Sequence, residues 1–184
     1  MDDGDEDDDR VQLREISMRH PVSIGDETIY LHGTRRRELK SILEHGLCAP
    51  KCGDLTIKKS HEGSCDEGIY FTNDPERADY WAWSRQMGIG EHSPRVMIGV
   101  RGSELKKNQC DLYVDWNVLQ DIVTDDPEFL SKVDGVLDKA DIEKEMDAFV
   151  ALNCPCIPPE SIAIIYELES ARPSEEPVYK IIHP

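Results

Sequence analysis

The chain has 184 residues, with 38 Asp or Glu against 21 Lys or Arg, and a formal net charge of −17. This length suits one domain with a sizeable core. The acidic balance opposes general nucleic-acid binding, which relies on Lys and Arg at the phosphate backbone. No run of about 18 apolar residues occurs, so the sequence predicts no membrane-spanning helix.

Residues 1–10 hold seven acids and no apolar residue after Met1. Such a run cannot bury apolar surface, so we predict a disordered acidic tail followed by a single domain over 11–184. No basic segment with an apolar stretch follows the start, so we expect no secretory signal and a cytoplasmic location.

Six cysteines occur, and none forms a CxxC pair. In a cytosolic chain they are expected to be reduced thiols. The alternative is a zinc site built from Cys48, Cys52, His61 and Cys65.

The first predicted strand covers residues 28–32, where alternation places Tyr30 and His32 on one face. Thr34 is suited to be the N-cap of a helix. Apolar residues then repeat at helical spacing, and Gly46 is typical of a left-handed residue that ends a helix.

The second predicted strand covers residues 68–72, with Tyr70 and Thr72 on one face. Asp74 and Pro75 follow it, which is the pattern of an N-cap and a first-turn proline. The sequence therefore predicts a second strand–helix unit like the first.

The rest of the chain is expected to form a loop between the two strand–helix units and further strands and helices after them. Residues 48–66 form a long loop of a kind that often acts as a lid. We predict a strand at Arg95–Val100, a helical insertion at about 115–146, and closing strands at 148–152, 162–168 and 178–182. Strands first, helices between and strands last predict an α+β fold with an antiparallel or mixed sheet.

Three segments of the chain form a pattern: His32-Gly33-Thr34, the spaced apolar residues from Leu39 to Leu47, and Gly68-Ile69-Tyr70-Phe71 followed by Ala78 and Tyr80. Together they resemble the ADP-ribosyltransferase superfamily. The branch resembled is typified by the poly(ADP-ribose) polymerase catalytic domain and diphtheria toxin. The resemblance covers residues 28–100 well and 147–168 loosely. It implies a split antiparallel or mixed sheet with flanking helices, NAD as co-substrate and no metal.

The resemblance also implies roles for single residues. His32 would bind the adenosine ribose of NAD, Gly33 the nicotinamide carboxamide, and Tyr70 one face of the nicotinamide ring. Tyr80 would cover the other face, although Tyr80 and Trp81 are neighbours and only one of them can face the cleft. We expect His32 and Tyr70 to point into one pocket from adjacent strands.

Two positions qualify this assignment. Arg77 stands near the place where the polymerases have a hydroxyl residue for the carboxamide, so Thr72 is expected to supply that contact. Thr34 completes the expected cofactor-binding set. The start of the first helix and Arg35–Arg37 would offer N–H groups and positive charge to a pyrophosphate.

The third member of the trio is an acid at the start of a later strand, where it would stabilise the positive charge that develops on the ribose. Asp147 and Glu145 precede the strand at 148–152. We rank Asp147 first, because it is nearest the position counted back from the closing strands. An aspartate there implies single transfer rather than chain elongation.

The expected function is therefore an NAD-dependent mono-ADP-ribosyltransferase that acts on a protein, nucleic acid or small-molecule acceptor. One alternative is a silent NAD or ADP-ribose binding module, which applies if neither acid reaches the cleft. Another is an RNA 2′-phosphotransferase, whose family shares the His-Gly-Thr start but carries a His-x-His segment that this chain lacks. The last is an interaction protein without a nucleotide.

Overall fold

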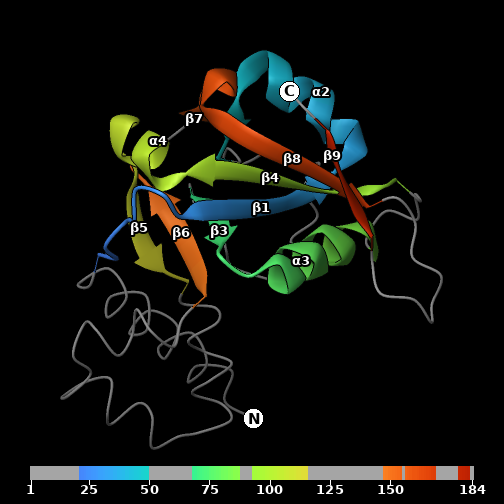
Figure 1. The fold of residues 1–184 in the computed structure, drawn as a ribbon, viewed down its shortest axis with the longest axis horizontal. Coiled ribbons are helices and arrows are strands. Elements are labelled where there is room, and N and C mark those ends of the chain that lie inside the picture. Colours follow the sequence, from blue (N-terminus) through green and yellow to red (C-terminus); the bar gives the residue numbers. More distant parts are fainter. Residues whose placement is uncertain are drawn as a thin grey trace, which may run out of the picture.

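The computed structural model describes residues 21–49, 68–87, 93–115, 147–154, 156–168 and 178–182. Seven strands form the main sheet: Ile29–Arg35 (β1), Ile69–Thr72 (β3), Arg95–Arg101 (β4), Asp111–Val114 (β5), Ala148–Leu152 (β6), Ile162–Leu168 (β8) and Tyr179–Ile182 (β9). They follow the spatial order β5-β6-β3-β1-β4-β8-β9 (Figure 1). Every neighbouring pair is antiparallel.

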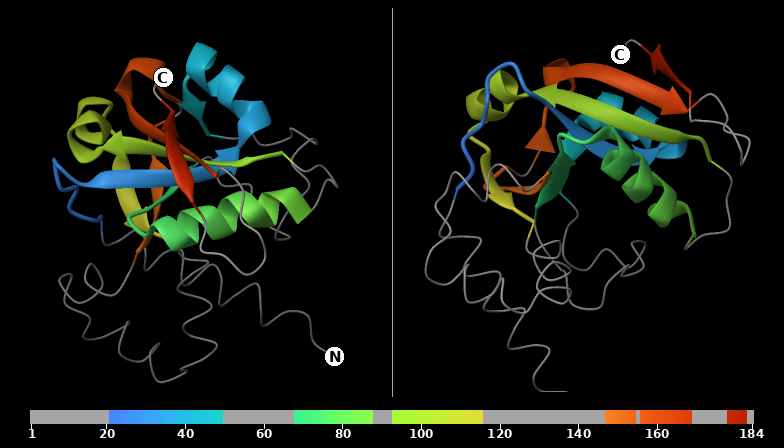
Figure 2. Two further views of the ribbon diagram at one scale, coloured as in Figure 1. Left: turned by 45° about the vertical axis from the view of Figure 1, so that its right-hand side comes forward. Right: turned by 60° about the horizontal axis from the view of Figure 1, so that its bottom comes forward.

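The other described elements flank this sheet. They are the helices Arg36–His45 (α2), Pro75–Met87 (α3) and Gly102–Lys107 (α4), the 3-10 turn Pro159–Ser161 (η1), and a small antiparallel sheet of Leu47–Cys48 (β2) with Cys156–Ile157 (β7). The views in Figures 1 and 2 show α2 and α3 on opposite sides of β1. The α+β prediction is thus confirmed, with a mostly antiparallel sheet.

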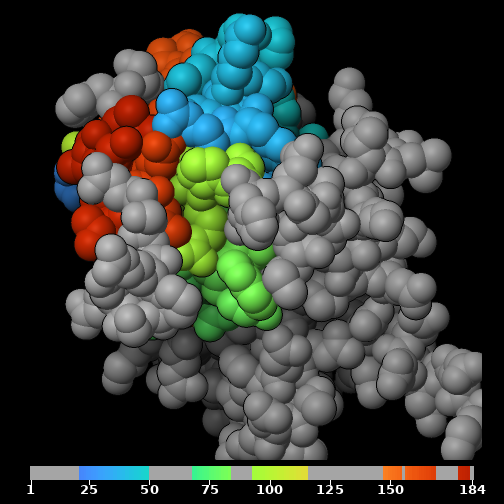
Figure 3. Space-filling model, turned by 90° about the vertical axis from the view of Figure 1, so that its right-hand side faces the viewer, coloured from blue at the N-terminus to red at the C-terminus, as the bar shows by residue number. Residues whose placement is uncertain are grey.

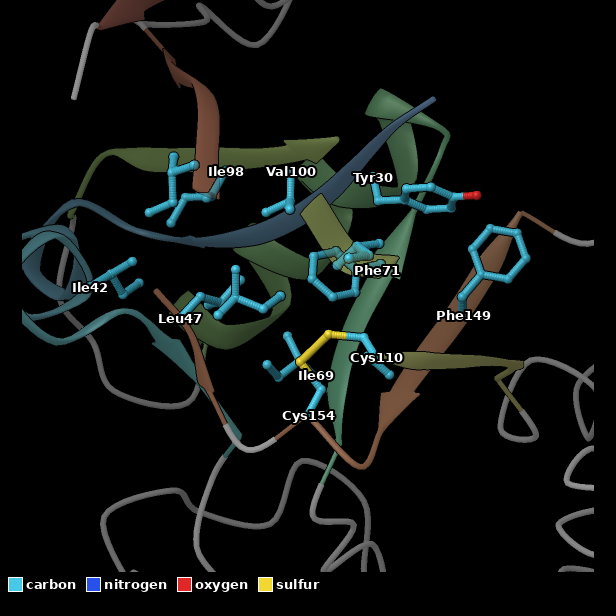
Figure 4. Packing of buried hydrophobic residues seen from close by; sticks show 14 of the residues in the cluster. Tyr30, Ile42, Leu47, Ile69, Phe71, Ile98, Val100, Cys110, Phe149 and Cys154 are labelled. Atoms are coloured by element: carbon cyan, nitrogen blue, oxygen red, sulfur yellow. A yellow bond between two sulfur atoms is a disulfide. The ribbon is translucent and has the colours of Figure 1, made fainter. Parts of the chain in front are cut away.

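Alternation along β1 divides its side chains between two cores. Tyr30 belongs to the larger one, which also holds Ile42 of α2 and Phe71 of β3 (Figure 4). Leu31 faces the other way, toward Ala78 of α3. Burying one such aliphatic side chain stabilises the fold by about 1.5–3 kcal/mol. Packing on both faces therefore fixes the register of β1.

The main sheet consists of two antiparallel halves. β1 pairs with β4 from Ile29↔Arg101 to Arg35↔Arg95, and β3 pairs with β6 over its whole length. Within the part of the chain that is described, β1 and β3 share the single pair Leu31↔Thr72. Figure 1 shows β6 running at a steep angle to β1. The halves β5-β6-β3 and β1-β4-β8-β9 thus diverge on either side of one ladder pair.

The start of α2 differs from the prediction. β1 continues to Arg35, so Thr34 is a strand residue and not an N-cap; Arg35 takes the cap position without a side-chain bond. Pairing with β4 overrides the local helix-start signal. α2 does end before Gly46, as predicted. Gly46 has φ 93 and ψ 171, which is outside the left-handed helical region, and a Cβ there would lie 2.4 Å from the carbonyl oxygen of Ile157.

Other predicted elements are confirmed. Asp74 Oδ1 accepts the backbone N–H of Glu76 at 3.0 Å and so caps α3. β4, β6, β8 and β9 lie at the predicted places, but β6 joins β3 and β5 and has no ladder with β8. β5 and α4 were not predicted. The acidic tail, most of the predicted loop and the helical insertion lie outside the described residues. No helix in the described ranges is long and apolar enough to cross a membrane.

The prediction of reduced cysteines is wrong for four of the six. Cys48 is bonded to Cys156, and Cys110 to Cys154. These partners are 108 and 44 residues apart in the sequence. Pairing of β2 with β7 and of β5 with β6 brings them together, which local spacing does not show. The alternative zinc site loses Cys48 to a disulfide, and its other three residues lie outside the described ranges.

Candidate functional site

His32 lies at the point where the two half-sheets diverge. Its side chain is buried, and its Nδ1 lies 2.9 Å from the carbonyl oxygen of Tyr70. The imidazole meets the ring of Phe71 edge-on, with 6.2 Å between centroids. A side-chain hydrogen bond therefore joins β1 to β3 beside their one ladder pair. His32 and Tyr70 are therefore adjacent, but the imidazole contacts the backbone of Tyr70 and not its side chain.

Their side chains do not share a face of the sheet, which corrects the predicted single pocket. Leu31 and Thr72 lie directly opposite each other, so alternation puts His32 with Phe71 on one face and Tyr70 with Thr72 on the other. The imidazole reaches Tyr70 through the backbone. Alternation predicted the faces within each strand, whereas the register between strands depends on tertiary pairing.

Trp81, and not Tyr80, covers Tyr70. The Tyr70 and Trp81 rings are 6.5 Å apart at 78°, an edge-to-face contact between β3 and α3. Tyr80 is 60% exposed and lies beside Trp83, at 5.9 Å between centroids. The stripe of Ala78 and Ala82 against the sheet indicates this rotation of α3, because Trp81 adjoins that stripe.

The candidate acid Asp147 lies next to the same face of α3. Its carbonyl oxygen accepts the N–H of Asn73 at 3.3 Å, which places it beside the end of β3. Its Oδ1 lies 2.8 Å from Nε of Arg77, and each of these side chains is about one-third exposed. The N–H of that Nε is not aligned with the carboxylate as a hydrogen bond. The second candidate, Glu145, lies outside the described residues.

Arg77 and Trp81 are one helical turn apart, so they share a face of α3 and are separated by about 6 Å along its axis. Arg77 contacts Asp147, and Trp81 contacts Tyr70. One side of α3 thus gathers the candidate acid and the aromatic pair. The ion pair between Arg77 and Asp147 was not predicted from the sequence.

Gly33 and the two threonines have structural roles that the sequence did not reveal. A Cβ on Gly33 would lie 2.0 Å from the carbonyl oxygen of Ala78, so the glycine lets α3 approach β1. Thr34 is fully buried and donates to Glu38 at 2.6 Å. The Thr72 hydroxyl accepts the N–H of Asp74 at 2.9 Å. Both predicted cofactor-binding hydroxyls therefore have partners within the protein.

The arginines at the start of α2 also have acidic partners. Arg36 forms an ion pair with the buried Glu167, and Arg35 and Arg37 lie 3.7 and 3.9 Å from Glu38. The starts of α2 and β4 lie side by side on the face shown in Figure 3, where the N–H of Arg36 donates to the carbonyl oxygen of Pro94. Their positive charge is compensated there, which weakens the expectation of a pyrophosphate site.

A shallow depression of about 560 Å³ lies at the far end of β5 and β6, away from these residues. It is lined by Val22, Ile24, Lys106, Gln109, Cys110, Asp111 and Asn153. Among the described residues, no group of three or more His, Cys, Asp or Glu could hold a metal ion. The chain matches no protein-family model and no curated protein.

Proposed function

We propose that the chain has an ADP-ribosyltransferase-like fold, binds NAD where its two half-sheets diverge, and transfers one ADP-ribose to an acceptor. The observation that carries this proposal is the buried His32, which bonds to the backbone of Tyr70 beside the single ladder pair. Burying an imidazole is costly unless it is hydrogen-bonded, and this bond holds the ring where the two half-sheets diverge. The split antiparallel sheet supports the same assignment.

The hydrogen bond of His32 fixes what its other nitrogen can do. A carbonyl oxygen only accepts, so Nδ1 carries the proton. In the neutral ring Nε2 is then an acceptor, suited to a ribose hydroxyl. Tyr70 and Trp81 supply aromatic surfaces for a flat nicotinamide ring. The imidazole lies on the opposite face of the sheet from the Tyr70 and Trp81 rings, so in this proposal NAD passes between β1 and β3 where the half-sheets diverge.

In the proposed reaction the bond between ribose C1 and the nicotinamide nitrogen breaks, and nicotinamide leaves with the electron pair. The acceptor nucleophile bonds to C1 and loses its proton. Positive charge develops on the ribose between these events, and a carboxylate at that place would stabilise it. Asp147 is the candidate acid, because its partner Arg77 lies one helical turn from Trp81 on α3.

One observation favours a second candidate, a module that binds NAD or ADP-ribose without transfer. The Asp147 carboxylate is paired with Arg77, whose positive charge offsets the negative charge that transfer needs. Transfer requires this pair to open when the ligand binds. A silent module would keep it closed.

The test is incubation of the full chain with NAD labelled in its adenylate part, scoring nicotinamide release and labelled acceptor, with calorimetry for binding. We expect wild type to bind and transfer, and Asp147→Asn to bind but lose on the order of 100- to 1000-fold in turnover. Asp26→Asn, at an exposed carboxylate paired with Lys106, is the matched control and should keep full turnover. Binding without transfer supports the silent module, and absence of binding refutes both.

A further inference from the structure

Two disulfides converge on the short connection that leaves β6. Cys154 is bonded to Cys110 and Cys156 to Cys48, so both crosslinks lie within three consecutive residues of the chain. Cys110 immediately precedes β5, and Cys48 ends β2, which follows α2. One crosslink therefore lies within the half-sheet β5-β6-β3. The other ties that half-sheet's outgoing chain to the segment that follows β1 and α2.

The two crosslinks differ in their access to solvent. Cys110 and Cys154 are 4% and 2% exposed and belong to the larger core beside Ile69 (Figure 4). Cys48 and Cys156 are both exposed. A reductant must bring a thiolate onto one sulfur of the disulfide, so access governs the rate. Cys110 borders the depression at the end of β5 and β6, but the two sulfur-bearing residues are almost fully buried, so attack on the Cys110–Cys154 bond should be slower.

The exposed disulfide Cys48–Cys156 joins the two strands of the small β2–β7 sheet. β2 and β7 share the two pairs Leu47↔Ile157 and Cys48↔Cys156. A two-stranded sheet of this length is not stable by itself in water. The buried side chains of Leu47 and Ile157 anchor its inner pair, whereas the outer pair is held by the disulfide.

We propose that Cys48–Cys156 is a redox modification site, opened by a dithiol reductant while Cys110–Cys154 stays closed, and that its opening loosens the β2–β7 pair. A thiolate of the reductant attacks one protein sulfur, the protein S–S bond breaks, and a mixed disulfide forms. The second thiol of the reductant then displaces that protein sulfur. Two electrons pass to the protein, Cys48 and Cys156 become thiols, and the reductant becomes a disulfide. The site does not depend on the proposed transferase activity.

The test uses the full chain, purified without reductant and treated with increasing dithiothreitol for fixed times. N-ethylmaleimide then blocks free thiols, and peptide mass spectrometry reads each cysteine separately. We expect no labelling of these four cysteines before treatment, and then labelling of Cys48 and Cys156 at least about tenfold faster than of Cys110 and Cys154. Labelling of Cys48 and Cys156 in untreated protein overturns the proposal, as does equal or earlier opening of Cys110–Cys154.

Hydrogen exchange tests the loosening. After selective opening, the backbone amides of β2 and β7 should lose protection while those of β4 keep theirs. A variant with both Cys48→Ser and Cys156→Ser should show this pattern from the start and not respond to dithiothreitol. Unchanged protection in the opened wild-type protein refutes the loosening. The order of labelling is read on wild type alone, so it stands even if the double variant fails to fold.

Discussion

Gly33→Ala tests whether this glycine is needed for the approach of α3 to β1. The added Cβ would lie 2.0 Å from the carbonyl oxygen of Ala78 and 3.0 Å from the backbone nitrogen of Ala82. Backbone atoms cannot rotate away, so the helix has to move as a unit. We expect the free energy of unfolding to fall by about 2–3 kcal/mol, the upper part of the range for overpacking. For a chain of this size the Tm falls by about 4–12 °C.

Gly99→Ala is the matched control, because Gly99 lies in the neighbouring strand β4 opposite Leu31. Its Cβ would meet the methyl groups Cγ2 of Ile164 at 2.5 Å and of Ile29 at 2.8 Å. Side-chain ends can give way, so we expect a loss of about 1 kcal/mol. Urea unfolding followed by tryptophan fluorescence measures both variants. A loss for Gly33→Ala no larger than for Gly99→Ala would refute the packing role.

Three further changes have defined outcomes. Glu167→Gln removes a buried charge paired with Arg36 and Lys180, and thermal unfolding should show a loss of about 1–3 kcal/mol. His32→Ala removes the buried imidazole that bonds to the Tyr70 carbonyl and should cost about 1–3 kcal/mol in urea unfolding, more than an exposed site would. Burial, and then the nearby Asp79 carboxylate, raises the pKa of Tyr179, so its neutral form stabilises the fold below about pH 10 and this stability is lost as pH rises further. Thermal melts between pH 8 and 11 should show a smaller alkaline loss in Tyr179→Phe.

Local patterns predicted the elements whose signals lie within one segment. Alternation and apolar runs located β1, β3 and β4, and the pair Asp74-Pro75 located the start of α3. They did not predict that β1 continues to Arg35, because that extension depends on pairing with Arg95. They also missed β5, which is defined by its ladder with β6 between Asp111 and Val114.

The sequence predicted which residues of the candidate site are neighbours, but not which side chains face one another. His32 and Tyr70 meet, but the register of β1 against β3 decides which side chains share a face, and no local signal carries it. The rotation of α3 decides between Tyr80 and Trp81 in the same way. The disulfides depend on the same strand pairing, since each joins residues far apart in the sequence.

α3 contacts both half-sheets at the candidate site. On one side α3 packs closely on β1, because the backbone of Ala78 lies directly against Gly33, where a side chain would not fit. On the other it contacts the half-sheet β5-β6-β3 through Trp81 with Tyr70 and through Arg77 with Asp147. A ligand ring that enters between Tyr70 and Trp81 must move these two surfaces apart.

On the proposed function, that separation also opens the ion pair and frees the acid, so binding works against the Arg77–Asp147 contact. Such a partly exposed pair is worth about 0.2–1 kcal/mol. Arg77→Met should therefore tighten NAD binding by up to about fivefold, measured by calorimetry. Arg101→Met is the control. It removes an exposed ion pair between Arg101, at the end of β4, and Glu27, and it should leave the Kd for NAD unchanged. Equal or weaker binding by Arg77→Met would mean that the ligand leaves the pair intact, and Asp147 would then remain neutralised in the complex, as the silent module requires.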